Sequence, residues 1–266
     1  MTTALTLSAI QYTALDGGIT ANAAEHIRLI EDADDHGARL VVFPELSLTG
    51  YDLNGLADPE RWVTAADPRL DGLREICRRT GITAVVGAPF READGTPRLA
   101  SLALHPNGGL DAGFKMWLHG AERQLFRAGD QVVILDLDGW RIALAIGPDA
   151  ARPVQAEAAE AGADVYAVSA RHAAGGDHRP ALQLGVRAMD NRMFSVLANL
   201  GGTTDGAPSA GGSGFWGPDG LVIRQAAGTG TEVLTTTLHH SVLDRHAREC
   251  HGRDRSAPAS RGPAAG

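Results

Sequence analysis

Two glutamates and one lysine are the residues of this chain best suited to chemistry. Glu45 closely follows the apolar stretch 39–43. Such a stretch is typical of a strand buried on both faces, and Glu45 would lie at the C-terminal end of that strand. Lys115 is the only lysine among the 24 lysine and arginine residues, which indicates a position where a guanidinium cannot replace an ammonium. Glu122 follows seven residues later. A carboxylate can accept or donate a proton, and an ammonium can stabilise an anion. These residue types are therefore suited to acid–base chemistry.

The two cysteines, Cys77 and Cys250, are far apart in the sequence. Their separation fits neither a disulfide framework nor a zinc-ligand spacing, so we expect a reducing, cytoplasmic location. Cys77 shares a helical face with Leu70 and Leu73, which predicts a small buried apolar residue.

Two weaker candidates lie in the second half of the chain. His246 and Cys250 have the i, i+4 spacing of a metal pair, but a polar terminal helix is the favoured interpretation, so we predict no metal and no cofactor. Ser169 follows a predicted strand near two histidines. It lacks the Gly-x-Ser-x-Gly pattern of a serine nucleophile, and we interpret it as a strand-end residue.

The composition limits the range of partners. The chain has 266 residues, a net charge of −8 and 44% hydrophobic residues, which describes a globular protein with a sizeable core. The negative charge disfavours nucleic acid and anionic membranes, and no apolar run is long enough for a membrane span. We therefore expect a soluble protein that binds neither nucleic acid nor a membrane. We also expect one domain over 1–251 and a disordered tail over 252–266, which is rich in Arg, Pro, Ala and Gly.

Hydrophobic periodicity indicates an α/β fold. Apolar strands alternate with amphipathic helices and hairpins, which favours a mixed sheet or paired sheets with helices on the outer faces. The small polar segment 201–212 predicts a loop. The expected strands are 5–11, 39–43, 82–87, 99–105, 131–137, 140–146, 164–168 and 194–199, and the expected helices are 20–36, 70–79, 154–161 and 180–191.

Several motifs, in order and spacing, resemble those of the nitrilase superfamily, the carbon–nitrogen hydrolases, over residues 5–243. The resemblance implies a four-layer αββα sandwich of the nitrilase type, pairing into a homodimer or a higher homo-oligomer, and a catalytic set of Glu45, Lys115 and a nucleophilic cysteine, with Glu122 in support. The motifs are Phe43-Pro44-Glu45 with Gly50-Tyr51; Lys115 with Leu118, Glu122, Phe126 and Gly129; Arg187-Ala188 with Asn191 and Asn199; Gly212-Ser213; and Pro218-Asp219-Gly220.

The chain departs from this pattern at the nucleophile. Where the family has its cysteine, the sequence reads Ile146-Gly147-Pro148-Asp149, and Trp117 stands in place of the family's histidine. The resemblance then implies that Gly147 is the position of a lost nucleophile. The residues expected to line the substrate pocket are Tyr51, Trp117, Pro148, Asp149 and Ser169.

Two functions remain open. In the first, Glu45 and Lys115 act on a small amide, nitrile or other C–N compound without a covalent intermediate. In the second, the protein is an inactive pseudoenzyme that binds a ligand or a partner. The single lysine favours the first. The sequence does not distinguish hydrolysis from elimination or cyclisation.

Overall fold

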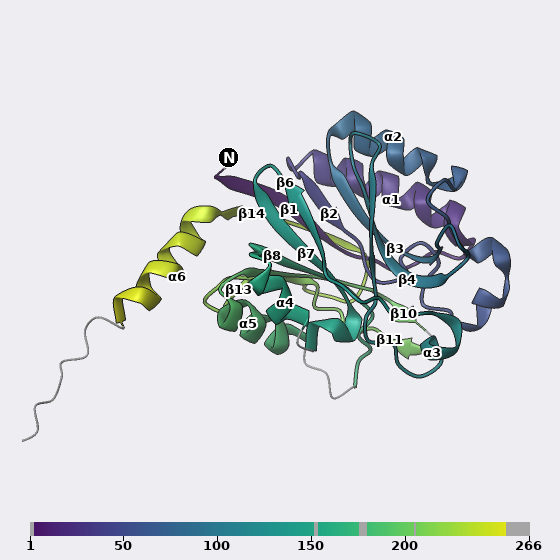
Figure 1. Ribbon diagram of the computed structural model, residues 1–266. Coiled ribbons are helices and arrows are strands. Elements are labelled where there is room, and N and C mark those ends of the chain that lie inside the picture. Colours follow the sequence, from purple (N-terminus) through teal and green to yellow (C-terminus); the bar gives the residue numbers. More distant parts are fainter. Residues whose placement is uncertain (1–2, 152–153, 176–179, 205, 254–266) are drawn as a thin grey trace, which may run out of the picture.

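The computed structural model describes residues 3–151, 154–175, 180–204 and 206–253. Two six-stranded mixed sheets lie face to face, with α1 and α2 on the outside of the first and α4 and α5 on the outside of the second (Figure 1). The predicted four-layer α/β sandwich is confirmed. The helices are α1 Gly18–Asp34, α2 Asp71–Thr80, α3 Glu122–Leu125, α4 Val154–Glu160, α5 Pro180–Asn191 and α6 His240–Arg253.

The first sheet has the order β14-β1-β2-β3-β4-β5, and the second has the order β13-β12-β9-β8-β7-β6. Parallel pairs β1–β2–β3 and β7–β8–β9 form the centre of each sheet, and antiparallel strands form the flanks. The strands are β1 Ala4–Gln11, β2 Leu40–Val42, β3 Thr83–Arg91, β4 Pro97–Leu104, β5 Leu110–Phe114, β6 Val133–Leu137, β7 Trp140–Ile146, β8 Val165–Ala170, β9 Phe194–Asn199, β12 Gly214–Trp216, β13 Val222–Gln225 and β14 Glu232–His239.

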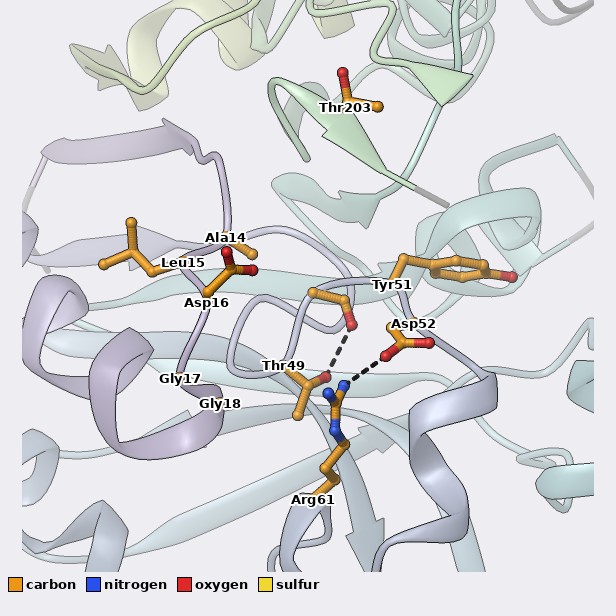
Figure 2. Close-up of a pocket in the computed structure, with 11 residues that line it drawn as sticks. Ala14, Leu15, Asp16, Gly17, Gly18, Thr49, Tyr51, Asp52, Arg61 and Thr203 are labelled. Carbon is orange, nitrogen blue, oxygen red and sulfur yellow. Dashed lines mark hydrogen bonds and ion pairs between the residues drawn. The ribbon is translucent and has the colours of Figure 1, made fainter. Parts of the chain in front are cut away.

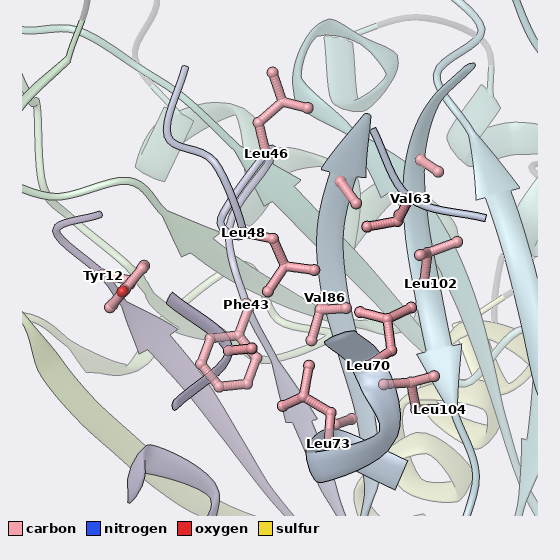
Figure 3. Close-up of a cluster of buried hydrophobic side chains, with 14 of the residues drawn as sticks. Tyr12, Phe43, Leu46, Leu48, Val63, Leu70, Leu73, Val86, Leu102 and Leu104 are labelled. Atoms are coloured by element: carbon pink, nitrogen blue, oxygen red, sulfur yellow. The ribbon is translucent and has the colours of Figure 1, made fainter. Parts of the chain in front are cut away.

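Three layers of buried side chains hold the four layers of backbone together. The first layer packs α1 and α2 against the first sheet, and Figure 3 shows part of it, including Phe43, Leu73 and Val86. The second layer, around Trp140, fills the space between the sheets. The third joins the second sheet to α4 and α5. Strands of both sheets thus have apolar residues on both faces, which explains the near-continuous apolar runs in the sequence.

The structure corrects the element prediction in two places. The segment 201–212, expected to be a loop, contains the short antiparallel pair β10 Thr203–Thr204 and β11 Ala207–Pro208. Strands β5, β12, β13 and β14 are absent from the expected strands. Strand β14 pairs along the whole of β1 as an edge strand, and its polar threonines hide it from a search for apolar runs. By contrast, the expected strand 140–146 and helix 180–191 coincide with β7 and α5.

Helix α6 projects from the end of β14 (Figure 1) and crosses the expected domain boundary at residue 251. Residues 254–266 of the expected tail lie outside the described residues, so its predicted disorder stays a prediction. Within the described part of the chain, no helix is both long and apolar enough to cross a membrane.

Candidate active site

Glu45 lies in a tight turn after β2, and the backbone of β3 packs directly against that turn. Leu46 has a φ of 52°, a left-handed conformation that costs a residue with a side chain about 1 kcal/mol or more. A Cβ on Gly87 would lie 2.2 Å from the Pro44 carbonyl oxygen and 2.4 Å from the Leu46 nitrogen. Only glycine therefore allows β3 to approach the turn this closely.

A buried histidine supports the same turn from α1. The His26 ring stacks on Phe43 at 3.9 Å between ring centroids, and its Nε2 lies 2.9 Å from the Ser47 hydroxyl oxygen. That oxygen accepts a hydrogen bond from the Gly87 nitrogen at 3.1 Å. Burial lowers the pKa of His26 to about 3, so its ring is neutral at physiological pH. Contacts on both sides of Glu45 thus fix the turn.

Glu45, Lys115 and Glu122 meet in one buried group, here called the Glu–Lys–Glu cluster. The Lys115 ammonium donates to Glu45 Oε1 at 2.6 Å and to Glu122 Oε1 at 2.7 Å. The three residues are 2%, 1% and 0% exposed. Lys115 thus lies between the two carboxylates, and the three residues that the family resemblance grouped together from separate motifs meet in space.

Glu122 begins α3 and receives two further hydrogen bonds. Tyr51 donates its hydroxyl to Glu122 Oε1 at 2.6 Å, and the His119 backbone nitrogen donates to Oε2 at 3.1 Å. Because these donors occupy both oxygens, Glu122 is held in the position of a support for Lys115. Tyr51, which the family resemblance placed in the substrate pocket, thus lies against the Glu–Lys–Glu cluster.

The two carboxylates of the cluster differ in acidity. Burial, together with the nearby Glu122 and Asp149 charges, raises the pKa of Glu45 despite its bond to Lys115. Burial also opposes ionisation of Glu122, but Lys115 and the hydrogen bonds of Tyr51 and His119 hold its pKa below the usual value. Burial disfavours the Lys115 ammonium too, yet the two carboxylates raise its pKa. Glu45, whose pKa is raised, is therefore the carboxylate of the cluster better suited to exchanging protons.

Gly147 begins a short 3₁₀ turn, Gly147–Ala151, after β7 and faces the cluster. Its φ is 53°, a conformation that glycine adopts without strain. A Cβ at this position would lie 2.9 Å from Glu45 Oε2 and 3.4 Å from Lys115 Nζ. Any side chain here would therefore touch both the carboxylate and the ammonium.

Asp149 ties the Gly147 turn to the segment that carries Lys115. Its carboxylate accepts from the Met116 and Trp117 backbone nitrogens at 3.2 and 2.9 Å, and from Ile146 at 3.4 Å. Burial raises its pKa. Asp149 thus acts as a brace between two loops of the site. Pro148 lies in the same turn as Asp149. The Trp117 residue, whose backbone nitrogen Asp149 binds, is 44% exposed.

Ser169, near the end of β8, makes a bond between the sheets. Its hydroxyl donates to the Phe43 carbonyl oxygen at 2.8 Å, and the residue is 1% exposed. The hydroxyl proton is therefore used to fix the strand that leads to Glu45. Cys77 lies buried in α2, as predicted, and burial raises the pKa of its thiol to about 11. The described residues contain no group of three acidic, histidine or cysteine side chains placed to hold a metal.

A surface hollow of about 350 Å³ borders the site at Tyr51 (Figure 2). The loop before α1 forms one wall, the segment 49–52 forms another, and Thr203 lies across from them. An ion pair between Arg61 and Asp52, 2.8 Å long, crosses its rim. None of the three residues of the Glu–Lys–Glu cluster lines this hollow. The hollow and the cluster are therefore neighbours joined through Tyr51.

Fold and cluster together define an α/β sandwich protein with a buried Glu–Lys–Glu site between the ends of two sheets. The chain belongs to the carbon-nitrogen hydrolase family, whose pattern matches residues 6–247. This confirms the superfamily named from the sequence motifs.

Among curated relatives, a nitrilase from Pyrococcus abyssi is 28% identical over 80% of this chain and 81% of its own length. A glutamine-dependent NAD(+) synthetase from Aquifex aeolicus is 26% identical over 94% of this chain, which spans only 46% of that enzyme. The chain also spans 41% of a second such synthetase, from Thermotoga maritima.

Similar solved structures include the amidase from Nesterenkonia sp. AN1. A variant with a cysteine replaced by alanine has a TM-score of 0.80 and 25% identity, and the match covers 94% of this chain and 96% of that one. The same kind of variant has been solved with butyramide, and another structure shows acrylamide added at the active-site cysteine. This likeness confirms the nitrilase-type fold.

Sequence reasoning missed two residues of the site. His119 bonds Glu122 through its backbone and brings its ring Nε2 to 3.5 Å from Glu122 Oε1. Arg171 lies over the Tyr51 ring, with its Cζ 4.8 Å from the ring centroid. The nearness of His119 to Glu122 in sequence was a usable signal. No local pattern points to Arg171, because it meets Tyr51 only through the packing of the two sheets.

Proposed function

We propose that this protein acts on a small amide, nitrile or other C–N compound by acid–base chemistry without a covalent intermediate. In this proposal Gly147 stands where relatives carry their nucleophilic cysteine. Glu45 is the general base, Lys115 stabilises the developing anion, and Glu122 holds Lys115 in place. Loss of the thiol closes the acyl-enzyme route.

One observation carries the proposal. Lys115 bonds Glu45 through Oε1, while Oε2 faces the side-chain position that Gly147 leaves unfilled, 2.9 Å from where a Cβ would lie. A water molecule in that position would give a proton to Glu45 and its oxygen to the carbon of the substrate. Glu45 would then pass the proton to the departing nitrogen, so that an amide yields an acid and an amine. The raised pKa of Glu45 suits both transfers.

The test compares wild type with Gly147→Cys and Glu45→Gln on panels of amides, nitriles and N-carbamoyl compounds. We expect turnover by the wild type, no substrate-derived adduct on the intact protein by mass spectrometry, and a loss of 10²- to 10⁴-fold in Glu45→Gln. An acyl adduct on any wild-type side chain would overturn the non-covalent route. An unchanged rate in Glu45→Gln, with the fold intact, would remove Glu45 from the mechanism.

The alternative is a pseudoenzyme that binds a ligand or a partner. It is favoured by the burial of the Glu–Lys–Glu cluster, whose ammonium is already bonded to both carboxylates. A pseudoenzyme would show no turnover in wild type, while Gly147→Cys would gain an adduct with reactive amides such as fluoroacetamide. Turnover by wild type that depends on Glu45 excludes this alternative.

We also propose that the protein pairs with a second copy through the outer face of α5. Leu182, Val186 and Met189 are exposed on one face of that helix and adjoin the exposed residues Leu221 and Val222. A continuous apolar face of this kind is typical of an interface. Light scattering should show a dimer that Met189→Glu converts to a monomer, whereas Leu15→Glu, at an exposed leucine away from this face, should leave it intact. A monomeric wild type would contradict the proposal.

A further inference from the structure

The Glu–Lys–Glu cluster is closed to solvent. Its three residues are 2%, 1% and 0% exposed, so a molecule can reach Glu45 only when a covering side chain moves. Tyr51 is a covering side chain, because it is 5% exposed and its hydroxyl donates to Glu122 Oε1 at 2.6 Å. Tyr51 also lines the hollow of about 350 Å³. Its side chain therefore lies between the hollow and the cluster.

The backbone on both sides of Tyr51 is fixed, whereas its side chain is free to rotate. The Thr49 hydroxyl donates to the Gly50 carbonyl at 3.0 Å, and Asp52 pairs with Arg61 at 2.8 Å. Figure 2 shows the Tyr51 ring directed away from Thr49 and from the centre of the hollow. Rotation about the Cα–Cβ bond to another staggered position turns the ring away from the cluster without moving this backbone.

The bond to Glu122 holds the ring without locking it. Burial, the nearby Glu45 charge and the bond to Glu122 raise the pKa of Tyr51, so its hydroxyl stays a donor at physiological pH. The net strength of a hydrogen bond to a charged group leaves it broken in roughly 1 to 10% of molecules. The closed state is therefore favoured, and the open state is populated.

The hollow provides the space that an open state needs. Its 350 Å³ corresponds to the volume of about ten water molecules, which accommodates the turned ring and a small amide together. The place that the ring leaves then joins the hollow to Glu45 and Lys115. When the ring returns, its hydroxyl binds Glu122 again and shuts the cluster off from bulk water.

We propose that the hollow is the entrance to the Glu–Lys–Glu cluster and that Tyr51 is its gate. The proposal rests on the proposed function for the reaction that follows entry. It adds the route that a small amide or nitrile takes and the residue that controls it.

The experiment measures access to the cluster, so that it does not depend on turnover. The reporter is Gly147→Cys, because a side chain there touches the cluster, in a Cys250→Ser background in which the buried Cys77 is kept. The probe is iodoacetamide, itself a small amide, and mass spectrometry gives the alkylation rate. Tyr51→Phe keeps the ring but loses the bond to Glu122, and should speed alkylation at least tenfold. Tyr51→Ala should speed it at least a hundredfold.

Filling the hollow tests the route. Thr203→Trp, across the hollow from Tyr51, should slow alkylation at least tenfold, and in the Tyr51→Ala protein it should cancel most of the gain. Two matched controls should leave the rate unchanged. Thr64→Trp adds the same ring at an exposed threonine outside the hollow. Tyr166→Phe removes a buried hydroxyl that donates to the Asp149 carbonyl at 3.3 Å, also outside the hollow.

If Gly147→Cys does not fold, reductive methylation of Lys115, the only lysine in the sequence, replaces the thiol reporter, with the N-terminal amine as its internal reference. An unchanged rate in Tyr51→Ala would overturn the gate, and a rate that Thr203→Trp does not alter would overturn the hollow as the entrance. Gated alkylation in a protein without turnover would support the gate while rejecting the proposed reaction. Turnover that depends on Glu45, with alkylation that no Tyr51 variant changes, would do the reverse.

Discussion

The turn that holds Glu45 and the turn that begins at Gly147 face the same Lys115 ammonium from opposite sheets, yet they are built differently. The Glu45 turn is tightly packed, with a left-handed Leu46, the β3 backbone against it and His26 beneath it. Gly147 has a positive φ like Leu46, but it presents no side chain to the cluster, and its turn is tied through Asp149 to the segment that carries Lys115.

In the proposed function, the Glu45 turn is the proton-transfer part of the site and the Gly147 turn is the covalent part. Strained backbone and buried charges are costly, and they persist where the surroundings enforce them. The Glu45 turn keeps both the strain and the charge. The Gly147 turn keeps the backbone shape, but glycine relieves its strain. In the proposed function, this comparison means that the proton-transfer half of the site is intact in this chain, while the covalent half is not.

The largest expected effect tests the link between the two turns. Lys115→Met leaves Glu45 and Glu122 facing each other in a buried space without a cation, and should lower the free energy of unfolding by about 3 to 5 kcal/mol in urea titrations. Replacing all three residues, as Lys115→Met with Glu45→Gln and Glu122→Gln, should recover most of the loss. A cost below about 1 kcal/mol for the single variant would show that the cluster is not the buried ion pair described above.

The next effect contrasts the two turns directly. Gly87→Ala forces a methyl group against the backbone of the Glu45 turn, 2.2 Å from the Pro44 oxygen, and should cost about 3 kcal/mol. Gly147→Ala meets the flexible ends of the Glu45 and Lys115 side chains and a positive φ, so about 1 kcal/mol is expected. Thermal and urea unfolding of both variants measure the difference. Equal costs would mean that the Gly147 turn is packed as tightly as the Glu45 turn.

A third effect concerns the protons of the Glu45 side. Because the pKa of Glu45 is raised, the base form is lost as the pH falls through that raised value. The midpoint of the acid limb of kcat/KM should therefore lie above the ordinary glutamate pKa of about 4.5. Below that midpoint, kcat/KM should fall tenfold per pH unit. Glu45→Asp should move this limb, whereas Glu75→Asp, on the exposed face of α2, should not. An acid limb below pH 4 would contradict the role of Glu45 as base.

The sequence was sufficient to predict the parts of the molecule that depend on local pattern. Apolar runs and helical spacing predicted β7, β9 and α5 with their observed bounds. The motif spacing also predicted that Glu45, Lys115 and Glu122 converge, which the 2.6 and 2.7 Å bonds confirm. The first success rests on residues whose neighbours in sequence determine their surroundings, whereas the second rests on the resemblance to the family, because Glu45 and Lys115 are 70 residues apart in the sequence.

What the sequence could not predict depends on long-range packing. Strand β14 is recognised only once β1 pairs with it, because hydroxyl pairs such as Ser8 with Thr235 lie along the contact and remove the apolar signal. The need for glycine at position 87 arises from a turn 40 residues away. Arg171 meets Tyr51 across the two sheets. No window of sequence holds both partners of these contacts.

The smallest expected effect tests the support beneath the Glu45 turn. His26 has a folded-state pKa of about 3 because it is buried, against about 6.5 when unfolded. The unfolded chain therefore binds a proton between these values that the folded chain does not. Stability from this residue is complete well above pH 6.5 and, below that pH, falls with a slope that approaches about 1.4 kcal/mol per pH unit. His26→Phe, which keeps a ring against Phe43, should reduce the fall in unfolding free energy between pH 6.5 and 5.5 by about 1 kcal/mol. His36→Phe, at an exposed histidine just beyond the same helix, is the control and should keep the wild-type slope. Identical slopes in all three proteins would show that the unfolded chain gains no proton at His26, and that the Glu45 turn does not rest on a buried neutral ring.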